Sequence, residues 1–520
     1  MLMLSYTQLD ADHRTSYELF ENEAERRIEL HRWRLYPYVI DQYDGLHVEV
    51  AAFLVNVHRI GSVADAEAYI ARLRGIQPLF RQVEERLAAS EAAGIVPPKF
   101  VFPQVAADIR ALLKGRPFER SGADSVLLKD FKDKVGALDL PAERRAALVD
   151  SATTALVEAV KPAYESLARK LAQLEKKATP GVAASQLPSG DGYYRAMLRF
   201  YTTSDLSPGE MHEVALAEVA RLHAEILKLG EGLGTNEPLP RLFKAMSSRP
   251  GASYPDTEAG RVAYLDDATR HLDAMKGKLG SLFNRVPDEP LQLQRVASLQ
   301  SRSAGNAFYV DAADGSQPAT VFFDVARMAD MPGYALEALV YHEGLPGHHL
   351  ERSHTLAIPG LADFRRFFPA AAYTEGWALY AERVAKEAGG YATPEAEYGR
   401  LVSELRSAAE LVVDTGIHGR KWTREEAIKY FLDNTPLGRA AATEAAERIS
   451  VTPGQAAAPT IGLLRIAELR QRALTELGER FDVREFHDAV LGSGPVPLNA
   501  LTREVTSYIE RKRPPTKPAG

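Results

Sequence analysis

The 520-residue sequence contains no cysteine, and this absence narrows the chemistry of the protein. Disulfides, iron–sulfur clusters, thiolate zinc ligands and a cysteine nucleophile are all excluded. Any bound metal must therefore use histidine, aspartate or glutamate side chains.

Basic residues are not in excess, and long apolar runs are missing. Lys and Arg total 63 against 70 Asp and Glu, which leaves a net charge of −7 and no basic surface suited to a phosphate backbone. No run approaches the roughly 18 apolar residues of a membrane-spanning helix. We therefore expect neither nucleic acid nor a membrane as a partner. Residues 1–27 also lack the basic-then-apolar pattern of an export signal, which predicts a cytoplasmic location.

Helical patterns occur along most of the sequence. Ser207-Pro208-Gly209-Glu210 combines a capping serine, a proline at the first helical position and a glutamate three residues after the cap, which predicts a helix over 208–229. Thr423-Arg424-Glu425-Glu426 repeats the capping pattern, and Thr393-Pro394 is typical of another helix start. Apolar residues at helical spacing predict further helices over roughly 15–36, 63–90, 142–176, 257–282, 333–345, 374–388, 395–417 and 461–478.

Two short segments instead favour β-strands. Residues 306–310 and 320–324 flank Asp314-Gly315, a dipeptide typical of hairpin turns. The predicted fold class is therefore mostly all-α, a large helical body with a small β-hairpin or short sheet. We expect an N-terminal helical lobe over 1–200, a second, catalytic helical lobe over 201–511 and a disordered tail over 512–520.

One short segment concentrates histidine. Four of the 13 histidines lie within residues 342–354, which begin HEGLPGHHLE. A His-Glu pair at the end of an apolar helix is typical of the zinc-peptidase helix, where a second histidine four residues on shares the metal. Here that position is a proline, and in an unbroken helix His348 would lie about 240° around from His342. Because Pro346-Gly347 interrupts a helix, we expect a bend that returns His348 or His349 toward His342. The alternative is a set of ordinary helix-end histidines.

A third metal ligand is expected further along the chain. Glu375 lies among apolar and aromatic residues in YTEGWALYAE, and a buried carboxylate is costly unless it is paired or bound to a metal. Its alternative role is that of an acidic residue stabilised by a helix N-terminus. Glu382, seven residues later, lies two turns along the same helix face, where it can support a ligand.

These two segments resemble the bacterial family called domain of unknown function 885, whose members carry His-Glu-(Gly/Ala)-(Ile/Leu)-Pro-Gly-His-His followed by Glu-Gly-Trp-Ala-Leu-Tyr. That family is similar to the helical gluzincin metallopeptidases, and the resemblance implies a zinc ion in a deep cleft between helical lobes. Further matches are spread along nearly the whole chain: Gly45-Leu46-His47, Gly94-Ile95-Val96-Pro97-Pro98, Tyr193-Tyr194-Arg195, Thr202-Thr203-Ser204-Asp205-Leu206, Asp414-Thr415-Gly416-Ile417-His418 and Pro453-Gly454-Gln455-Ala456.

The resemblance implies a role for each residue of the two segments. It assigns His342, His348 and Glu375 as zinc ligands, with His349 as the alternative to His348, and Glu343 as the general base. Three protein ligands leave a fourth position for water, as in catalytic zinc sites. The base would take the proton of that water and pass it to the leaving amine.

Amide hydrolysis also needs a donor for the oxyanion that forms. We expect His418 to be that donor and Asp414, one turn earlier, to orient it; the alternative is an ordinary contact between residues four apart on a helix. One departure from the family concerns Pro459, which stands where members have a tyrosine. Tyr373, Tyr380 or His418 is expected to replace that phenol, or the specificity has changed.

The function expected from these residues is zinc-dependent hydrolysis of amide bonds in short peptides. Tyr309, Tyr380 and Asp414 are expected to contact the substrate, Tyr309 through a strand edge, because extended peptides pair with exposed strands. One alternative is a hydrolase of a non-peptide amide or ester in a specialised pathway. Another is a binding or scaffold protein without turnover, suggested by Pro459, although a scaffold has no need of the base Glu343. A homodimer is left open.

Overall fold

The computed structural model describes residues 6–249, 251–296, 305–311 and 318–513. These residues form a mostly helical protein with one small sheet, which confirms the predicted fold class. The expected turn at Asp314-Gly315 lies outside the described residues, as does the expected tail beyond Arg513.

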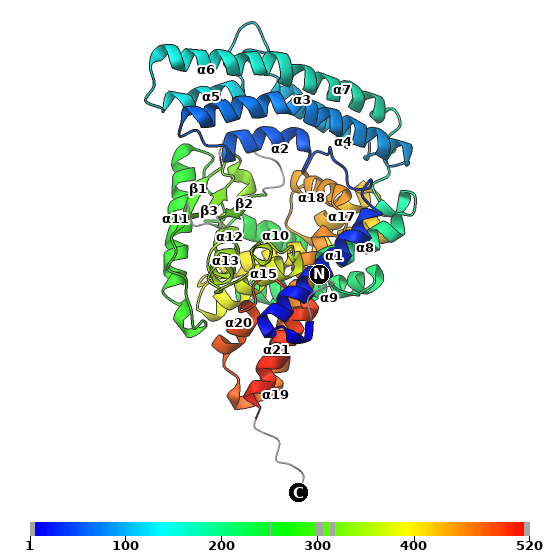
Figure 1. Ribbon diagram of the computed structural model, residues 1–520. Helices are drawn as coiled ribbons and strands as arrows, with labels where there is room; N and C mark the ends of the chain where they lie inside the picture. Colours follow the sequence, from blue (N-terminus) through cyan, green and yellow to red (C-terminus); the bar gives the residue numbers. More distant parts are fainter. Residues whose placement is uncertain (1–5, 250, 297–304, 312–317, 514–520) are drawn as a thin grey trace.

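A smaller helical lobe is built around one apolar core, formed by residues between Ile40 and Leu174 together with Val451. Its longest helix buries Tyr69, Leu73 and Ile76 at the three- and four-residue spacing of an amphipathic helix. Figure 1 shows the lobe as a layer across one end of the molecule. Its helices are α2 (Leu46–Ala52), α3 (Val63–Ala92), α4 (Val101–Leu112), α5 (Val126–Gly136), α6 (Ala142–Ala155) and α7 (Lys161–Glu175).

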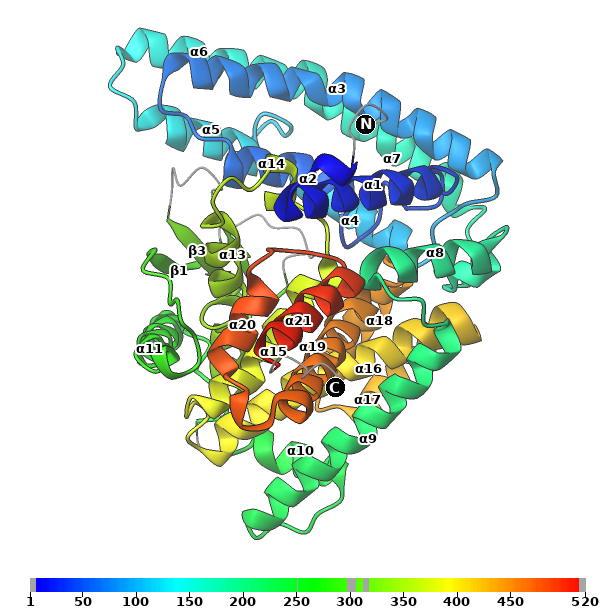
Figure 2. The same ribbon diagram turned by 60° about the horizontal axis from the view of Figure 1, so that its bottom comes forward.

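A larger helical body has its own continuous core. Figure 2 shows α9 and α16 running side by side through it, and the two helices are in contact. The helices of this body are α1 (Ala11–His31), α8 (Gly190–Thr202), α9 (Pro208–Gly232), α10 (Leu239–Ser247), α11 (Glu258–Lys276), α12 (Leu336–Glu343), α13 (His348–Leu356), α14 (Asp363–Arg366), α15 (Ala371–Glu387), α16 (Pro394–Arg420), α17 (Arg424–Asn434), α18 (Arg439–Val451), α19 (Ala458–Leu477), α20 (Val483–Leu491) and α21 (Leu498–Lys512).

The smaller core uses residues 40–174 and Val451, whereas the larger core uses Leu19, Trp33 and residues from Val182 onward, so the lobes do not divide at residue 200 as expected. The reason is packing: α1 and α8 bury their apolar residues in the larger body although both precede residue 203. The lobes meet at α18, where the side-chain amides of Gln42 and Gln104 donate to the backbone carbonyl and the carboxylate of Glu447.

The sheet has three strands in the order β1-β3-β2. β2 (Ala307–Val310) is antiparallel to β3 (Ala319–Phe323), with Tyr309 opposite Val321, so both predicted strands are confirmed. β1 (Leu291–Arg295) pairs in parallel with the other side of β3 and was not predicted. β2 is therefore an edge strand, and it contacts α12.

Local sequence signals begin several helices of the larger body. The capping boxes at Ser207 and Thr423 are both present, and Thr393 caps α16 by accepting from the N–H of Ala396. α15 packs closely on α19 because Gly462 has no side chain; a Cβ there would lie 1.7 Å from the carbonyl oxygen of Ala372. This contact fixes the N-terminal half of α15. Among the described helices, none combines the length and apolarity required to cross a bilayer.

Candidate metal centre

The candidate ligands lie at a break between two helices. Residues 344–347 separate α12 from α13, so the break predicted at Pro346-Gly347 is confirmed. The N–H of Gly347 donates to the carbonyl oxygen of Tyr341 at 2.9 Å, which turns the chain back over the end of α12. A Cβ atom at residue 347 would lie 1.8 Å from the carbonyl oxygen of His342, so this turn requires glycine.

Two histidines and one glutamate converge at this break. The Nε2 atoms of His342 and His348 lie 3.9 Å and 3.8 Å from the same atom, Oε2 of Glu375 on α15. The two imidazole rings are nearly perpendicular, at 83°, with centroids 5.1 Å apart. Both histidine side chains are mostly buried, whereas that of Glu375 is 42% exposed, so the cluster opens to solvent on the Glu375 side.

A second carboxylate supports His342 on its other side. Nδ1 of His342 donates to Oε1 of Glu382 at 2.9 Å, and the hydroxyl of Ser403 on α16 donates to the same oxygen at 2.9 Å. Metal-binding histidines commonly hold their second ring nitrogen in this way, which fixes the tautomer and leaves the other nitrogen for the metal. The position of Glu382 on the same face of α15 as Glu375 is the one expected from their spacing.

Glu343 lies next to the histidines and is almost fully buried. The backbone N–H of Tyr309 on β2 donates to its carboxylate. Burial raises the pKa of Glu343 to about 7, and the positive charge of His342 opposes this effect. A carboxylate with a pKa near neutrality is suited to accept a proton from water and to release it again.

The two histidines differ in charge when no metal is bound. Burial lowers the pKa of His348 to about 4, so this imidazole is neutral at pH 7. Burial also acts to lower the pKa of His342, but the hydrogen bond and negative charge of Glu382 outweigh it and raise the value to about 9. His342 must therefore release a proton before its Nε2 can bind a metal.

Both Glu343 and Glu375 are close enough to be the third ligand. Donor atoms of His342, Glu343 and His348 all lie within 4.8 Å of one another, whereas Glu375 directs one oxygen toward both Nε2 atoms. Glu375 is the better candidate for the third ligand, because the carboxylate of Glu343 is held by the backbone of Tyr309. Two imidazoles and one carboxylate are a donor set that suits zinc, so these residues fit the ion that the resemblance implies.

His349, the alternative ligand, has both ring nitrogens engaged. Its Nε2 donates to the carbonyl oxygen of Glu289 at 3.3 Å, and its Nδ1 accepts from the hydroxyl of Tyr309 at 3.2 Å. The ring is buried. His349 therefore links α13 to β2, and of the two neighbouring histidines His348 is the one that faces the cluster.

The predicted role of His418 needs correction. This residue is fully buried; its Nδ1 accepts from the N–H of Ala184 and its Nε2 donates to the carbonyl oxygen of Ile449, both at 2.9 Å. It lies about 22 Å along α16 from Ser403, at 1.5 Å per residue. His418 thus has no ring nitrogen available for an oxyanion, and it instead joins three backbone segments.

Asp414 and Tyr380, predicted to contact the substrate, are also enclosed in the core. Asp414 accepts from the hydroxyl of Tyr194 at 2.6 Å, and the hydroxyl of Tyr380 donates to Nε2 of His487 at 3.0 Å. Tyr380 is five residues after Glu375, which places it about 140° around α15 from the ligand face. The structure does not bring either residue to the cluster.

Pro459, which stands where family members have a tyrosine, suits its position at the start of a helix. Pro459 lies in the first turn of α19, where the absence of a backbone N–H carries no penalty. Tyr373, a candidate replacement, is buried, and its hydroxyl donates to the carbonyl oxygen of Val490 at 3.0 Å. Of the tyrosines predicted for the site, Tyr309 alone lies beside the cluster.

Two parts of this region were not predicted from the sequence, Ser403 and β1. Ser403 reaches Glu382 from a different helix, 21 residues away, and no spacing rule connects the two. β1 did carry a signal, because its Leu-Gln-Leu-Gln alternation has the two-residue period of a strand.

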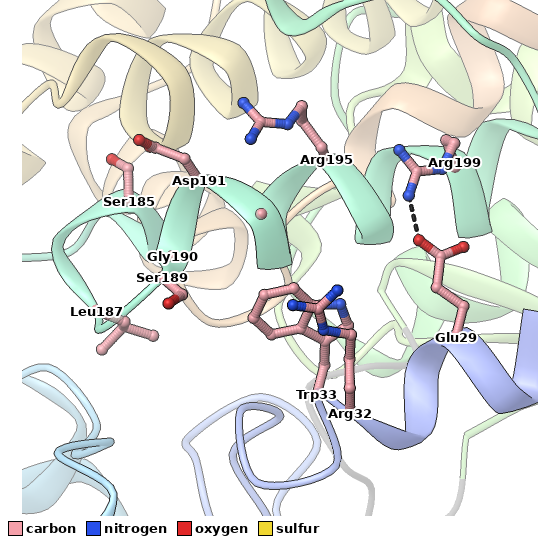
Figure 3. A pocket seen from close by; sticks show the side chains of 11 residues that line it. Glu29, Arg32, Trp33, Ser185, Leu187, Ser189, Gly190, Asp191, Arg195 and Arg199 are labelled. Carbon is pink, nitrogen blue, oxygen red and sulfur yellow. Dashed lines mark hydrogen bonds and ion pairs between the residues drawn. The ribbon is translucent and has the colours of Figure 1, made fainter.

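A cavity of about 550 Å³ lies apart from the cluster, between the end of α1 and the start of α8 (Figure 3). Arg199 and Glu29 form an ion pair across it, and the guanidinium of Arg32 lies 4.7 Å from the centroid of the Trp33 ring. No residue that lines this cavity belongs to the histidine and glutamate cluster.

Comparisons with known proteins place these features in a family. A crystal structure described as that of a "putative lipoprotein" from Colwellia psychrerythraea is similar, with a TM-score of 0.87 and 30% sequence identity over 92% of this chain and 81% of that chain. A "putative lipoprotein of unknown function" from Shewanella oneidensis shares the fold, with a TM-score of 0.70 and 16% identity over 96% of this chain and 89% of that chain. Among curated proteins, none matches. The family described as "Bacterial protein of unknown function (DUF885)" matches residues 2–505, and the chain belongs to this family.

Proposed function

We propose that the protein is a zinc-dependent hydrolase that cleaves amide bonds in short peptides. The observation that carries the proposal is the approach of His342 Nε2 and His348 Nε2 to one oxygen of Glu375. Two imidazoles and a carboxylate form the ligand set of many hydrolytic zinc sites, with one position left open. A bound zinc ion would supply the Lewis acidity that polarises a scissile carbonyl and acidifies a water molecule.

The residues of the chain have distinct parts in this mechanism. His342, His348 and Glu375 would hold the ion. Glu343 accepts the proton of the attacking water at its carboxylate and returns it to the leaving amine, a task for which a pKa of about 7 is suited. Glu382 keeps a proton on Nδ1 of His342, so that Nε2 presents its lone pair to the cluster.

An extended substrate would pair with the edge strand β2. Among the described residues this strand pairs with β3 alone, and its Tyr309 adjoins Glu343. An exposed strand edge offers evenly spaced N–H and C=O groups, which bind extended main chain whatever the side chains. This arrangement supports a peptide substrate over a compact non-peptide amide or ester, which remains the alternative substrate class.

A catalytically impaired binding protein is the other alternative. Its support is Pro459, which removes the phenol expected from the family. Against it, Glu343 and the support of His342 by Glu382 are both retained, and neither is needed by a protein that only binds.

The location of the protein also enters the proposal. The sequence predicts a cytoplasmic protein, whereas the structural neighbour with 30% identity is described as a "putative lipoprotein". We propose that this chain instead acts outside the cytoplasm. Fractionation of the native organism followed by immunodetection tests this, and recovery in the cytoplasmic fraction contradicts it.

The test of the function uses purified, zinc-loaded protein and a library of short peptides. The wild type is expected to hold about one zinc per chain and to cleave a subset of the library. Glu343→Gln is expected to keep the zinc and to lose about 10² to 10⁴-fold in turnover, because glutamine cannot accept a proton. Glu375→Gln is expected to lose the zinc, because a neutral amide is a weaker ligand than a carboxylate.

A matched control is Glu468→Gln, which makes the same change at an exposed glutamate in α19 and should alter neither zinc content nor turnover. Wild-type protein without zinc or without any cleaved peptide contradicts the proposal. If instead Glu343→Gln loses the metal and Glu375→Gln keeps it, the two glutamates have exchanged roles.

A further inference from the structure

We propose that Ser403 is a positioning residue that sets the metal affinity of the site by holding Glu382 against His342. The inference rests on the proposed function and concerns the same metal centre. It assigns a role to a residue of α16 that is not a ligand and does not face the open side of the cluster.

A single carboxylate oxygen of Glu382 links His342 to Ser403. Oε1 of Glu382 accepts from Nδ1 of His342 and from the hydroxyl of Ser403, each at 2.9 Å. The other oxygen, Oε2, is buried and has no hydrogen-bond partner among the described residues. Glu382 itself is 1% exposed, so water does not substitute for either donor. Ser403 is therefore the only second anchor that the described structure gives to this carboxylate.

An ion pair next to Ser403 and Glu382 holds α15 and α16 together. Arg383 and Glu404, the next residues along α15 and α16, form an ion pair with Nε donating to Oε2 at 3.1 Å. Arg221 on α9 also pairs with Glu404. The distance between Ser403 and Glu382 is thus fixed by an adjacent contact, and loss of the Ser403 hydroxyl would not be compensated by a shift of α16.

The physical effect of the hydroxyl is on orientation. A carboxylate with one donor can rotate about its last side-chain bond, whereas two donors on one oxygen restrict that rotation. A fixed carboxylate keeps the His342 imidazole, whose Nδ1 it accepts from, in the direction that presents Nε2 to a metal.

Zinc affinity is therefore the property to measure. Loss of a partner outside the ligand shell costs about 10 to 100-fold in affinity, and since Ser403 acts through Glu382 we expect about 10-fold for Ser403→Ala. Ser403→Thr retains the hydroxyl and is expected to stay within about threefold of the wild type.

The experiment is chelator competition on the full chain, at a fixed pH, for the wild type and each variant. Ser407→Ala is the matched control, because Ser407 lies one turn further on α16 and is partly buried like Ser403. It should leave affinity unchanged. The absorption spectrum of the cobalt-loaded protein is a second measurement, since displacement of one ligand changes it at saturating metal. Ser403→Cys, which keeps the volume but donates weakly, serves if the alanine variant does not fold.

The outcomes separate this inference from the proposed function. Wild-type protein that binds no zinc overturns both. Wild-type protein that binds zinc while Ser403→Ala has the same affinity and cobalt spectrum overturns the role of Ser403 and leaves the metal site intact. Weakening in Ser403→Ala with recovery in Ser403→Thr and no change in Ser407→Ala supports it.

Discussion

Replacing Gly347 with alanine tests the helix break that brings the two histidines together. An added Cβ would lie 1.8 Å from the carbonyl oxygen of His342 and 2.5 Å from that of Tyr341, and both are backbone atoms. Real contacts of this kind essentially never fall below 3.0 Å, so the backbone must shift by about 1 Å or more. Metal sites tolerate deviations of only about 0.2 Å in ligand distances. The zinc affinity of Gly347→Ala is therefore expected to fall by on the order of 100-fold or more.

The same substitution should also destabilise the metal-free protein. Overpacking of a tight interior site costs about 1 to 3 kcal/mol, and here no flexible side chain can move aside. Thermal unfolding in chelator measures this cost, and unfolding with added zinc measures how much stability the metal restores. The wild type should gain stability from zinc, and Gly347→Ala should gain little.

The control for this prediction is Gly280→Ala, because a Cβ at Gly280 meets no heavy atom within 4 Å. That variant should match the wild type in both measurements. If Gly347→Ala bound zinc within about threefold of the wild type and unfolded at the same temperature, the close approach of residue 347 to α12 would not be what holds His348 in place.

Three further predictions follow from the contacts of individual histidines. Zinc uptake at pH 7.5 should release about one proton, because His342, with a pKa of about 9, is protonated when no metal is bound, and the zinc affinity should rise with pH up to about 9. Calorimetry in buffers of different ionisation enthalpy measures the proton release, and its absence contradicts the prediction. The His418→Ala variant should keep its zinc, but its free energy of unfolding should fall by about 2 to 4 kcal/mol, because two buried backbone groups lose their hydrogen-bond partner. A variant with full stability and no turnover would instead support a catalytic role for His418. His348→Ala should lose the metal and His349→Ala should keep it, as measured by elemental analysis, and the reverse result would make His349 the ligand.

The features that were predictable from the sequence are those with local causes. Ser207 with Glu210 determines the start of α9 through contacts within four residues, and Thr423 does the same for α17. The break after α12 was expected from the backbone chemistry of Pro346-Gly347. The convergence of His348 on His342 was expected for the same reason, although which of two neighbouring histidines faces the cluster depends on the contacts of Tyr309 and was left open.

Contacts between distant helices were not predictable in this way. A histidine in an apolar helix, such as His418, has the same sequence surroundings whether it serves the backbone or a substrate. The structure separates the two cases, because both nitrogens of His418 are taken by the backbone groups of Ala184 and Ile449. Ser403 is the opposite case, a common residue type on a helix whose importance comes entirely from Glu382 on a neighbouring helix.

The two buried carboxylates Glu382 and Asp414 show what distinguishes a supporting group of a site from a structural one. Burial raises the pKa of both, that of Asp414 to about 7, and each accepts two hydrogen bonds. Perturbed titration alone therefore does not identify the functional residue. The difference lies in where the hydrogen-bonded chain ends. From Asp414 it ends at the buried hydroxyl of Tyr194, whereas from Glu382 it passes through the ring of His342 to an Nε2 atom that faces the solvent-exposed Glu375. A buried carboxylate can affect ligand binding when its hydrogen-bond partner has a second polar atom at an open cluster. When that partner is enclosed in the core, the carboxylate can only stabilise the fold.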